Sequence, residues 1–242
     1  MKIKFFVFLT FCCFSFLSWS QFLDSAQGGN DSRLNDAFTS LRNSIQKSSN
    51  DLSSVSGSPH LSDKFINSEV IYFGKKLKDK IFLRYNAYND EVEMAKSSEQ
   101  SNTEDILIKN SSVSCIIEGI EYRYLPYPEK RQNFPKAGYV QVLFEGKNVS
   151  LYKKNRKIFM EAKKARTSLE RSFPARFVDE AYYLYNTKGK PLKILKLSKS
   201  DIKKAFETSE KSVANYLKKN KPNLKNSEDL VDLFSFIDKR GQ

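Results

Sequence analysis

The densest cluster of residues in this chain that could do chemistry lies between positions 83 and 93 and includes Arg84, Asn86, Glu91 and Glu93. On a strand, Glu91 and Glu93 share one face, at a spacing compatible with the paired carboxylates of a glycoside hydrolase. Arg84 and Asn86 share a face in the same way and could bind a carboxylate or a sugar. The same pattern also predicts a cross-strand salt bridge from Arg84 to Glu91 or Glu93. Glutamates two residues apart are ordinary strand patterning, so the structural role is favoured.

Basic residues interleaved with aromatic ones form a second candidate site. Lys153, Lys154 and Arg156 follow Tyr152, and a basic loop is expected over residues 163–176. This pattern suits an anionic polymer or a lipid head group. An exported protein rarely meets nucleic acid, so an acidic glycan or a lipid head group fits better than RNA or DNA. A solvated loop explains the same residues without any ligand.

The histidine and cysteine content excludes most familiar catalytic and metal centres. His60 is the only histidine, and Cys115 is the only cysteine after residue 13. Zinc frameworks need several such residues, and neither a Gly-x-Ser-x-Gly elbow nor a glycine-rich phosphate loop is present. We therefore predict no metal, no cofactor and no catalytic residue, and binding rather than catalysis. The apolar run around Cys115 predicts a buried, inert thiol.

The first twenty residues predict export. Lys2 and Lys4 precede an apolar stretch over residues 5–17, and small residues follow, so cleavage after Ser20 is expected. Thirteen apolar positions are fewer than the roughly 20 needed to span a bilayer, and no transmembrane segment is predicted after removal of the signal. That removal takes away two lysines and no acidic residue, so the net charge falls from +13 to +11.

The elements that must position these side chains are mainly strands. Alternating apolar and polar residues with intervening turns predict antiparallel strands between residues 65 and 197, including a hairpin that pairs 139–144 with 149–152. Three short helices follow, the first capped by Ser198 or Ser200. We expect an α+β protein with a signal at 1–20, an amphipathic helix and tether at 21–58, a β-domain (sandwich or open barrel) at 59–197, and a helical tail at 198–242.

Three stretches in this order resemble a family of proteins. They are LRYNAYNDEVE at 83–93; GYVQVLFEG at 138–146 with SLY at 150–152; and a third that runs from YYL at 182–184 through GKP at 189–191 and KSD at 199–201 to EDL at 228–230. They resemble an uncharacterised secreted or periplasmic family of Bacteroidota, and the resemblance covers about residues 57–239. It implies a cell-envelope setting and no particular activity or site residue.

These observations favour an exported, non-enzymatic binding protein in the periplasm, at the outer membrane or outside the cell. Its expected partner is an anionic glycan, a lipid or another envelope protein. The alternatives are a structural adaptor that docks through the apolar stripe Leu34, Phe38, Leu41 and Ile45, a half-open barrel that carries lipid, and a glycan hydrolase acting through Glu91 and Glu93.

Overall fold

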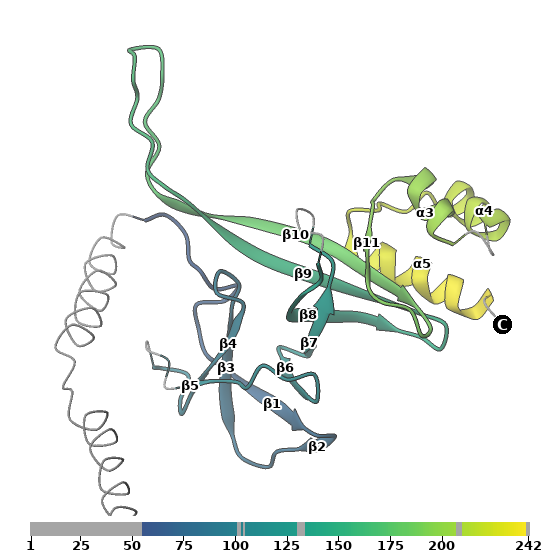
Figure 1. Cartoon of the computed structure of the whole chain (residues 1–242), viewed down its shortest axis with the longest axis horizontal. Coiled ribbons are helices and arrows are strands. Elements are labelled where there is room, and N and C mark those ends of the chain that lie inside the picture. Colours follow the sequence, from purple (N-terminus) through teal and green to yellow (C-terminus); the bar gives the residue numbers. More distant parts are fainter. Residues whose placement is uncertain (1–54, 101–102, 104, 130–133, 207–209, 241–242) are drawn as a thin grey trace, which may run out of the picture. The chain divides into compact units, whose positions relative to one another are not determined.

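Alternation of apolar and polar residues builds one antiparallel sheet in the computed structural model (Figure 1). The structure describes residues 55–242 except 101–102, 104, 130–133, 207–209 and 241–242. Residues 55–242 form a structural unit of their own. The predicted signal and the predicted N-terminal amphipathic helix lie outside the described residues.

Within the described residues, eleven strands are followed by three helices. The strands are β1 (Ile66–Tyr72), β2 (Lys75–Lys76), β3 (Ile81–Asn86), β4 (Glu91–Ala95), β5 (Asp105–Ile106), β6 (Val113–Ile117), β7 (Ile120–Tyr127), β8 (Lys136–Glu145), β9 (Val149–Met160), β10 (Arg176–Thr187) and β11 (Lys193–Leu195). The helices are α3 (Lys199–Ala205), α4 (Glu210–Asn220) and α5 (Ser227–Arg240). The order across the sheet is β11-β10-β9-β8-β7-β6-β1-β3-β4-β5, and β2 pairs with β1. The predicted antiparallel β-domain with a C-terminal helical tail is confirmed, as one open sheet instead of a two-sheet sandwich.

The turn between β3 and β4 returns to the middle of β9. The Lys157 backbone N–H donates to Ala87 O at 3.0 Å, and the Ala87 N–H donates to Pro59 O at 2.9 Å. β9 pairs with β8 only up to Lys153, so Ala87 occupies part of the β9 edge that β8 leaves open. The sheet therefore bends until residues of β3 and β9 share one buried environment.

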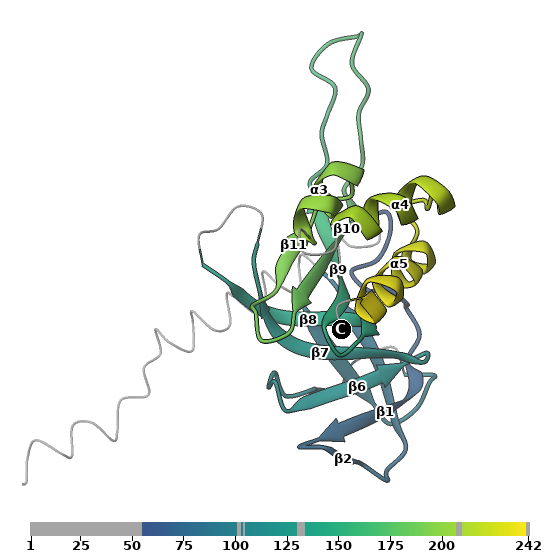
Figure 2. The same cartoon turned by 90° about the vertical axis from the view of Figure 1, so that its right-hand side faces the viewer.

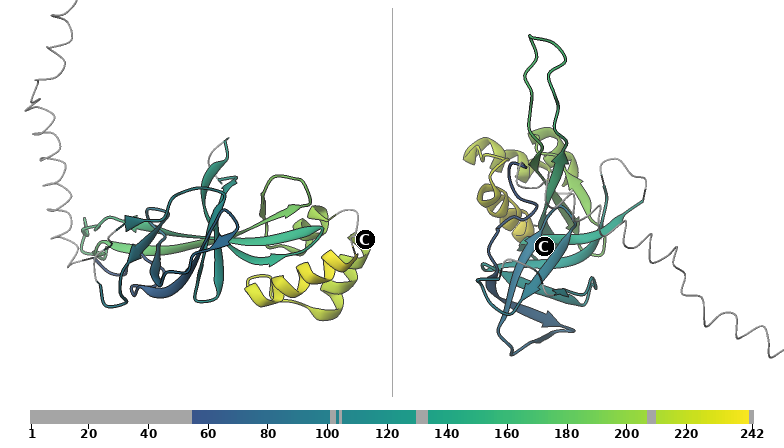
Figure 3. Two further views of the ribbon diagram at one scale, coloured as in Figure 1. Left: turned by 90° about the horizontal axis from the view of Figure 1, so that it is seen from below. Right: turned by 90° about the vertical axis from the view of Figure 1, so that its left-hand side faces the viewer.

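The three helices lie on one face of the sheet at its β8–β11 end, as the left view of Figure 3 shows. Leu151, Tyr185, Leu230 and Phe234 belong to the buried cluster that joins these helices to β9 and β10. Ser198 caps α3, since its Oγ accepts the Asp201 N–H at 3.1 Å. Sequence periodicity placed all three helices because each carries one apolar stripe.

The C-terminal helix also fastens the β8–β9 turn. Asp238 Oδ1 accepts the backbone N–H groups of Asn148 at 2.7 Å and Val149 at 3.1 Å, and Oδ2 accepts that of Lys147 at 3.1 Å. A β-carbon at Gly146 would overlap the Asp238 carboxylate, so glycine is required there. The β8–β9 turn, which the sequence predicts as a simple hairpin loop, is therefore held by a side chain about 90 residues away.

A second core lies between β1, β3, β4, β6 and β7. Leu83, Val92 and Cys115 are fully buried in it. Burial raises the pKa of the Cys115 thiol to about 12, so the thiol is protonated at neutral pH. The sequence-based expectation of a buried, inert cysteine agrees with this environment.

The opposite face of β8, β9 and β10 carries a third cluster. It contains Tyr127, Tyr152, Tyr182 and Leu184. Leu151 and Tyr152 are neighbours in β9 that contribute to different clusters, because successive side chains of a strand point to opposite faces. No helix of the described residues contributes to this third cluster.

The β9–β10 hairpin is much longer than its sequence indicates. The strand predicted from the sequence ends at Tyr152, whereas β9 runs unbroken from Val149 to Met160. The polar run at 153–157 hid the continuity, since Lys154 is buried and does not follow apolar alternation. In Figures 1 and 2 the far end of this hairpin projects clear of the other described elements. None of the described helices is long and apolar enough to cross a membrane.

Candidate functional site

The residues predicted between positions 83 and 93 meet around one buried carboxylate, that of Glu93. Strands β3 and β4 pair Arg84 directly with Glu93. Arg84 Nε donates to Glu93 Oε2 at 2.7 Å, and Asn86 Nδ2 donates to Oε1 at 2.8 Å. His60 Nε2 lies 3.2 Å from both oxygens. The cross-strand salt bridge predicted for Arg84 is therefore present, with Glu93 as the partner.

The polar side chains of this network satisfy one another's hydrogen-bonding groups. Burial would raise the pKa of Glu93, but hydrogen bonds from His60, Asn86 and Arg84 outweigh that effect and lower the pKa to about 2. Asn86 Oδ1 also accepts the backbone N–H groups of Tyr88 at 3.2 Å and Asn89 at 3.0 Å, which holds the β3–β4 turn. Arg84 stacks on the Phe65 ring, 4.2 Å from its centroid. The geometry is that of a structural brace, with the Glu93 carboxylate already occupied.

Glu91 lies apart from this brace. Its carboxylate accepts from Lys109 Nζ at 3.0 Å. Glu93 is only 6 % exposed, and three neighbouring side chains surround its oxygens. The two carboxylates that sequence spacing paired are thus bound to different cations, and nothing in their arrangement points to glycoside hydrolysis.

His60 has a partner that sequence reasoning missed. Its Nδ1 lies 3.3 Å from Ser58 Oγ, and its Nε2 contacts Glu93. The imidazole therefore lies between a serine hydroxyl and a glutamate carboxylate. Ser58 Oγ, however, donates to Asp63 and accepts the His60 N–H at 3.1 Å. This is a serine turn that fastens the loop before β1, and its hydroxyl is already committed to Asp63.

Lys154 is the most buried charged side chain in the described residues, with 1 % exposed. Its Nζ contacts Asp90 Oδ2 at 2.7 Å and Tyr139 O at 2.8 Å, and lies 5.0 Å from the Tyr127 ring centroid. Burial lowers the pKa of Lys154 to about 8, against the opposing effect of Asp90. Asp90 Oδ1 in turn accepts from Tyr85 Oη at 2.7 Å. This pair joins the β3–β4 turn to β9 inside the protein.

The Lys154–Asp90 pair leaves no room for a side chain at Gly138. A β-carbon there would overlap Asp90 Oδ2 and lie 3.0 Å from Tyr127 Cε1 and 3.1 Å from Lys154 Nζ. We expect Gly138→Ala to lower the free energy of unfolding by about 1–3 kcal/mol, because these neighbours are held in place by the pair. Urea denaturation measures the change. Ala137→Val alters an exposed neighbour on the same strand and serves as the control; equal stability of the two variants would contradict the prediction.

The basic residues predicted as one binding surface are separated. Lys154 is inside the protein, whereas Lys153 lies on the opposite face of β9 and is partly exposed. Arg156 Nη1 contacts Glu129 Oε1 at 2.6 Å and Glu180 Oε2 at 3.9 Å. These three cations therefore do not form a common anion-binding patch.

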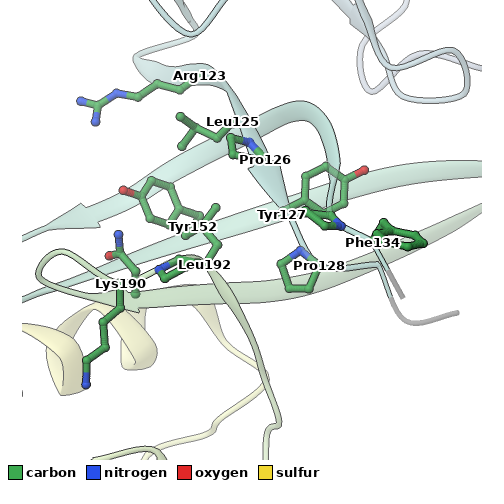
Figure 4. Close-up of a pocket in the computed structure, with 12 residues that line it drawn as sticks. Arg123, Leu125, Pro126, Tyr127, Pro128, Phe134, Tyr152, Lys190 and Leu192 are labelled. Atoms are coloured by element: carbon green, nitrogen blue, oxygen red, sulfur yellow. The ribbon is translucent and has the colours of Figure 1, made fainter. Parts of the chain in front are cut away.

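An open groove of about 680 Å³ lies on the sheet face opposite the helices, at the third buried cluster. This volume is typical of small-molecule sites. Nine of its twelve lining residues are apolar or aromatic: Leu125, Pro126, Tyr127, Pro128, Phe134, Pro135, Tyr152, Pro191 and Leu192. The other three are Arg123, Asn186 and Lys190. In Figure 4, Arg123 and Lys190 lie at one end, and Tyr127, Pro128 and Phe134 lie at the other.

The two cations of the groove differ in availability. Arg123 donates to Glu121 at 2.8 Å and to Glu145 at 2.6 and 2.8 Å, and this contact lowers the pKa of Glu145. Lys190 is exposed on the turn between β10 and β11. The polar end of the groove can therefore offer the Lys190 ammonium to an anionic group, while the guanidinium of Arg123 is taken up by two carboxylates.

Sequence reasoning missed this groove because its walls come from distant segments. Leu125 to Tyr127 end β7 and Pro128 follows it, Tyr152 belongs to β9, and residues 190–192 lead into β11. The Pro-Tyr-Pro run at 126–128 was the available signal, since prolines flanking a buried tyrosine form rigid apolar surface. Strand pairing alone brings these segments together.

Comparisons with known proteins add no assignment to this geometry. No protein-family model matches the chain, and neither a curated protein nor a solved structure shows significant similarity to it. Within the described ranges, no group of three or more His, Cys, Asp or Glu side chains could hold a metal ion.

Proposed function

We propose that this protein is an exported, non-enzymatic binding protein of the cell envelope whose ligand is a lipid. The signal-like N-terminus and the resemblance to envelope proteins of Bacteroidota support the location. The groove supports the ligand class, and its apolar lining is the observation that carries the proposal. In this proposal the acyl chain lies along Leu125, Pro128 and Leu192, and an anionic head group lies near Lys190.

A lipid fits the groove better than a glycan. Sugar recognition needs many polar side chains aimed at hydroxyl groups, whereas three polar residues line this groove and Arg123 is bound to two glutamates. The polar groups between residues 83 and 93 are already bound by neighbouring side chains, so they supply no second ligand site. An anionic head group is also consistent with the net charge of +11 that remains after removal of the predicted signal.

Lipid binding is testable on the protein purified from cells that express the full chain. Mass spectrometry of an organic extract should release a lipid, and a fluorescent single-chain fatty acid should bind and be displaced by unlabelled fatty acid. Leu192→Glu should weaken binding at least about tenfold, because it places a charge in the apolar lining. Ile108→Glu introduces the same charge at a site that is 62 % exposed and outside the groove, and should bind as the wild type does.

The head-group assignment has its own test. Lys190→Glu should weaken binding of the fatty acid but leave binding of the matched monoacylglycerol unchanged, since only the acid carries a charge. An empty extract together with no binding of fatty acid by the folded wild type would overturn the proposal. So would equal affinities of the wild type and Leu192→Glu.

A further inference from the structure

The distal β9–β10 hairpin, here called the arm (residues 158–178), has no role in the groove or in the helix-covered core. β9 and β10 pair along their whole length, from Val149 with Thr187 to Met160 with Arg176. Backbone hydrogen bonds between Lys163 and Phe173 continue the ribbon beyond the strands. Every residue from 161 to 174 is exposed. In Figure 1 the arm extends past the rest of the sheet, and Figure 2 shows the same from the side.

One large apolar side chain, Leu169, is exposed at the apex of the arm. Leu169 is 95 % exposed, the most exposed of the large hydrophobic side chains described. It sits in a turn closed by the Glu170 N–H, which donates to Thr167 O at 3.2 Å. Phe173 and Met160, further down the arm, are 47 % and 45 % exposed. A leucine held at the end of a projecting ribbon adds nothing to a core, so its exposure needs another explanation.

Cations lie directly behind this apex. Residues 161–176 contain five basic side chains, Lys163, Lys164, Arg166, Arg171 and Arg176, against two acidic ones, Glu161 and Glu170. Arg176 lies over the Phe173 ring, 5.3 Å from its centroid. The four cations from Lys163 to Arg171 are all exposed. The arm is therefore a positively charged ribbon with an exposed leucine at its end.

The leucine at the apex and the cations behind it match the layers of an anionic bilayer that the tip of the arm would meet first. A leucine that leads the arm would enter the acyl boundary, while arginine and lysine behind it remain at the depth of the phosphates. Each cation near an anionic membrane surface contributes about 1 kcal/mol, so several act together. An acidic protein would complement the charge but would leave the apex leucine without a reason. We propose that the arm is a membrane-contact element that binds the surface of anionic phospholipid bilayers through Leu169 and its flanking cations.

The proposal concerns a surface separate from the groove, and vesicle binding tests it. Protein purified from cells expressing the full chain is mixed with phosphatidylcholine vesicles that contain either no phosphatidylglycerol or a large fraction of it, and is then sedimented. Wild-type protein should bind the anionic vesicles strongly and the neutral vesicles weakly. Binding should fall with rising salt, because counterions screen the attraction.

Three variants assign the binding to the arm. Leu169→Asp and the double variant Arg166→Ser, Arg171→Ser should each lower the vesicle partition coefficient at least about tenfold. Lys218→Ser with Lys219→Ser removes the same charge from the exposed end of α4 and should retain nearly full binding. All of these positions are exposed, so folding should be unchanged, and circular dichroism verifies it.

The outcomes separate the arm from the groove. The groove variant Leu192→Glu should still bind vesicles. Vesicle binding that disappears with Leu192→Glu but persists in the arm variants would overturn the proposal and assign membrane contact to the groove. Equal losses in the arm and α4 charge variants would overturn it in favour of unspecific attraction. No preference of the wild type for anionic vesicles would also overturn it and leave an acidic protein as the partner of the arm.

Discussion

Lys154→Met is expected to lower the free energy of unfolding by about 3–5 kcal/mol, although it keeps most of the side-chain volume. The substitution removes the ammonium that contacts Asp90 at 2.7 Å and Tyr139 O at 2.8 Å. The Asp90 carboxylate would then remain largely shielded from water without its countercharge. Urea denaturation at neutral pH measures the loss, and the folded baseline shows whether the β3–β4 turn still docks on β9.

A double-mutant cycle separates the pair from the packing. Asp90→Asn keeps an acceptor for Tyr85 Oη and the Tyr139 N–H and tolerates the positive φ of 59° at this position. Combined with Lys154→Met, it should restore part of the stability that Lys154→Met alone loses, because no buried charge is left unpaired. Lys153→Met changes the adjacent, partly exposed lysine and should cost less than about 0.5 kcal/mol. Strict additivity of the two buried substitutions would contradict a coupled pair.

Acid should remove the stabilisation that Glu93 provides. The pKa of Glu93 is lowered from 4.5 to about 2 by its three hydrogen-bonding neighbours, against the effect of burial. A depressed carboxylate pKa stabilises the folded state above the unfolded pKa, and this contribution is lost as the pH falls through the folded pKa. Between pH 5 and pH 2 the loss amounts to about 3 kcal/mol, since one pKa unit corresponds to about 1.4 kcal/mol.

Comparison with a non-titrating variant isolates this effect from other carboxylates. Glu93→Gln should be less stable than the wild type by about 3 kcal/mol at pH 7, and the gap should nearly close at pH 2. Glu91→Gln, at a partly exposed pair with Lys109, should change stability by less than about 1 kcal/mol at either pH. A gap between Glu93→Gln and the wild type that is the same at pH 7 and pH 2 would show that Glu93 is not the acid-sensitive group.

Local patterning predicted most of the secondary structure. The three helices were found because each has an apolar stripe, and the predicted cap Ser198 is the cap of the first. The pairing of Arg84 with the β4 glutamates followed from a short turn, which sets the register of a hairpin. Both inferences depend on residues within about ten positions of one another, where spacing along the chain approximates spacing in the fold.

The same reasoning misjudged residues whose environment comes from elsewhere in the chain. Lys154 was assigned to a solvated or ligand-binding stretch, yet Asp90, 64 positions earlier, and the β3–β4 turn enclose it. His60 contacts Glu93, 33 positions later, only because the sheet places the two side chains together. A charged residue is predicted to be exposed by default, and only a long-range countercharge reverses that.

Composition, charge, the strand and helix pattern and the shortage of histidine and cysteine all follow from the amino-acid sequence, because each depends on residue type or on local spacing; export stays a prediction from the first twenty residues. The tertiary structure alone decided which cations are buried, where the groove lies and how far the arm projects. Those features arise from the pairing of strands that are distant along the chain, and the energy of that pairing resides in contacts that local spacing does not reveal.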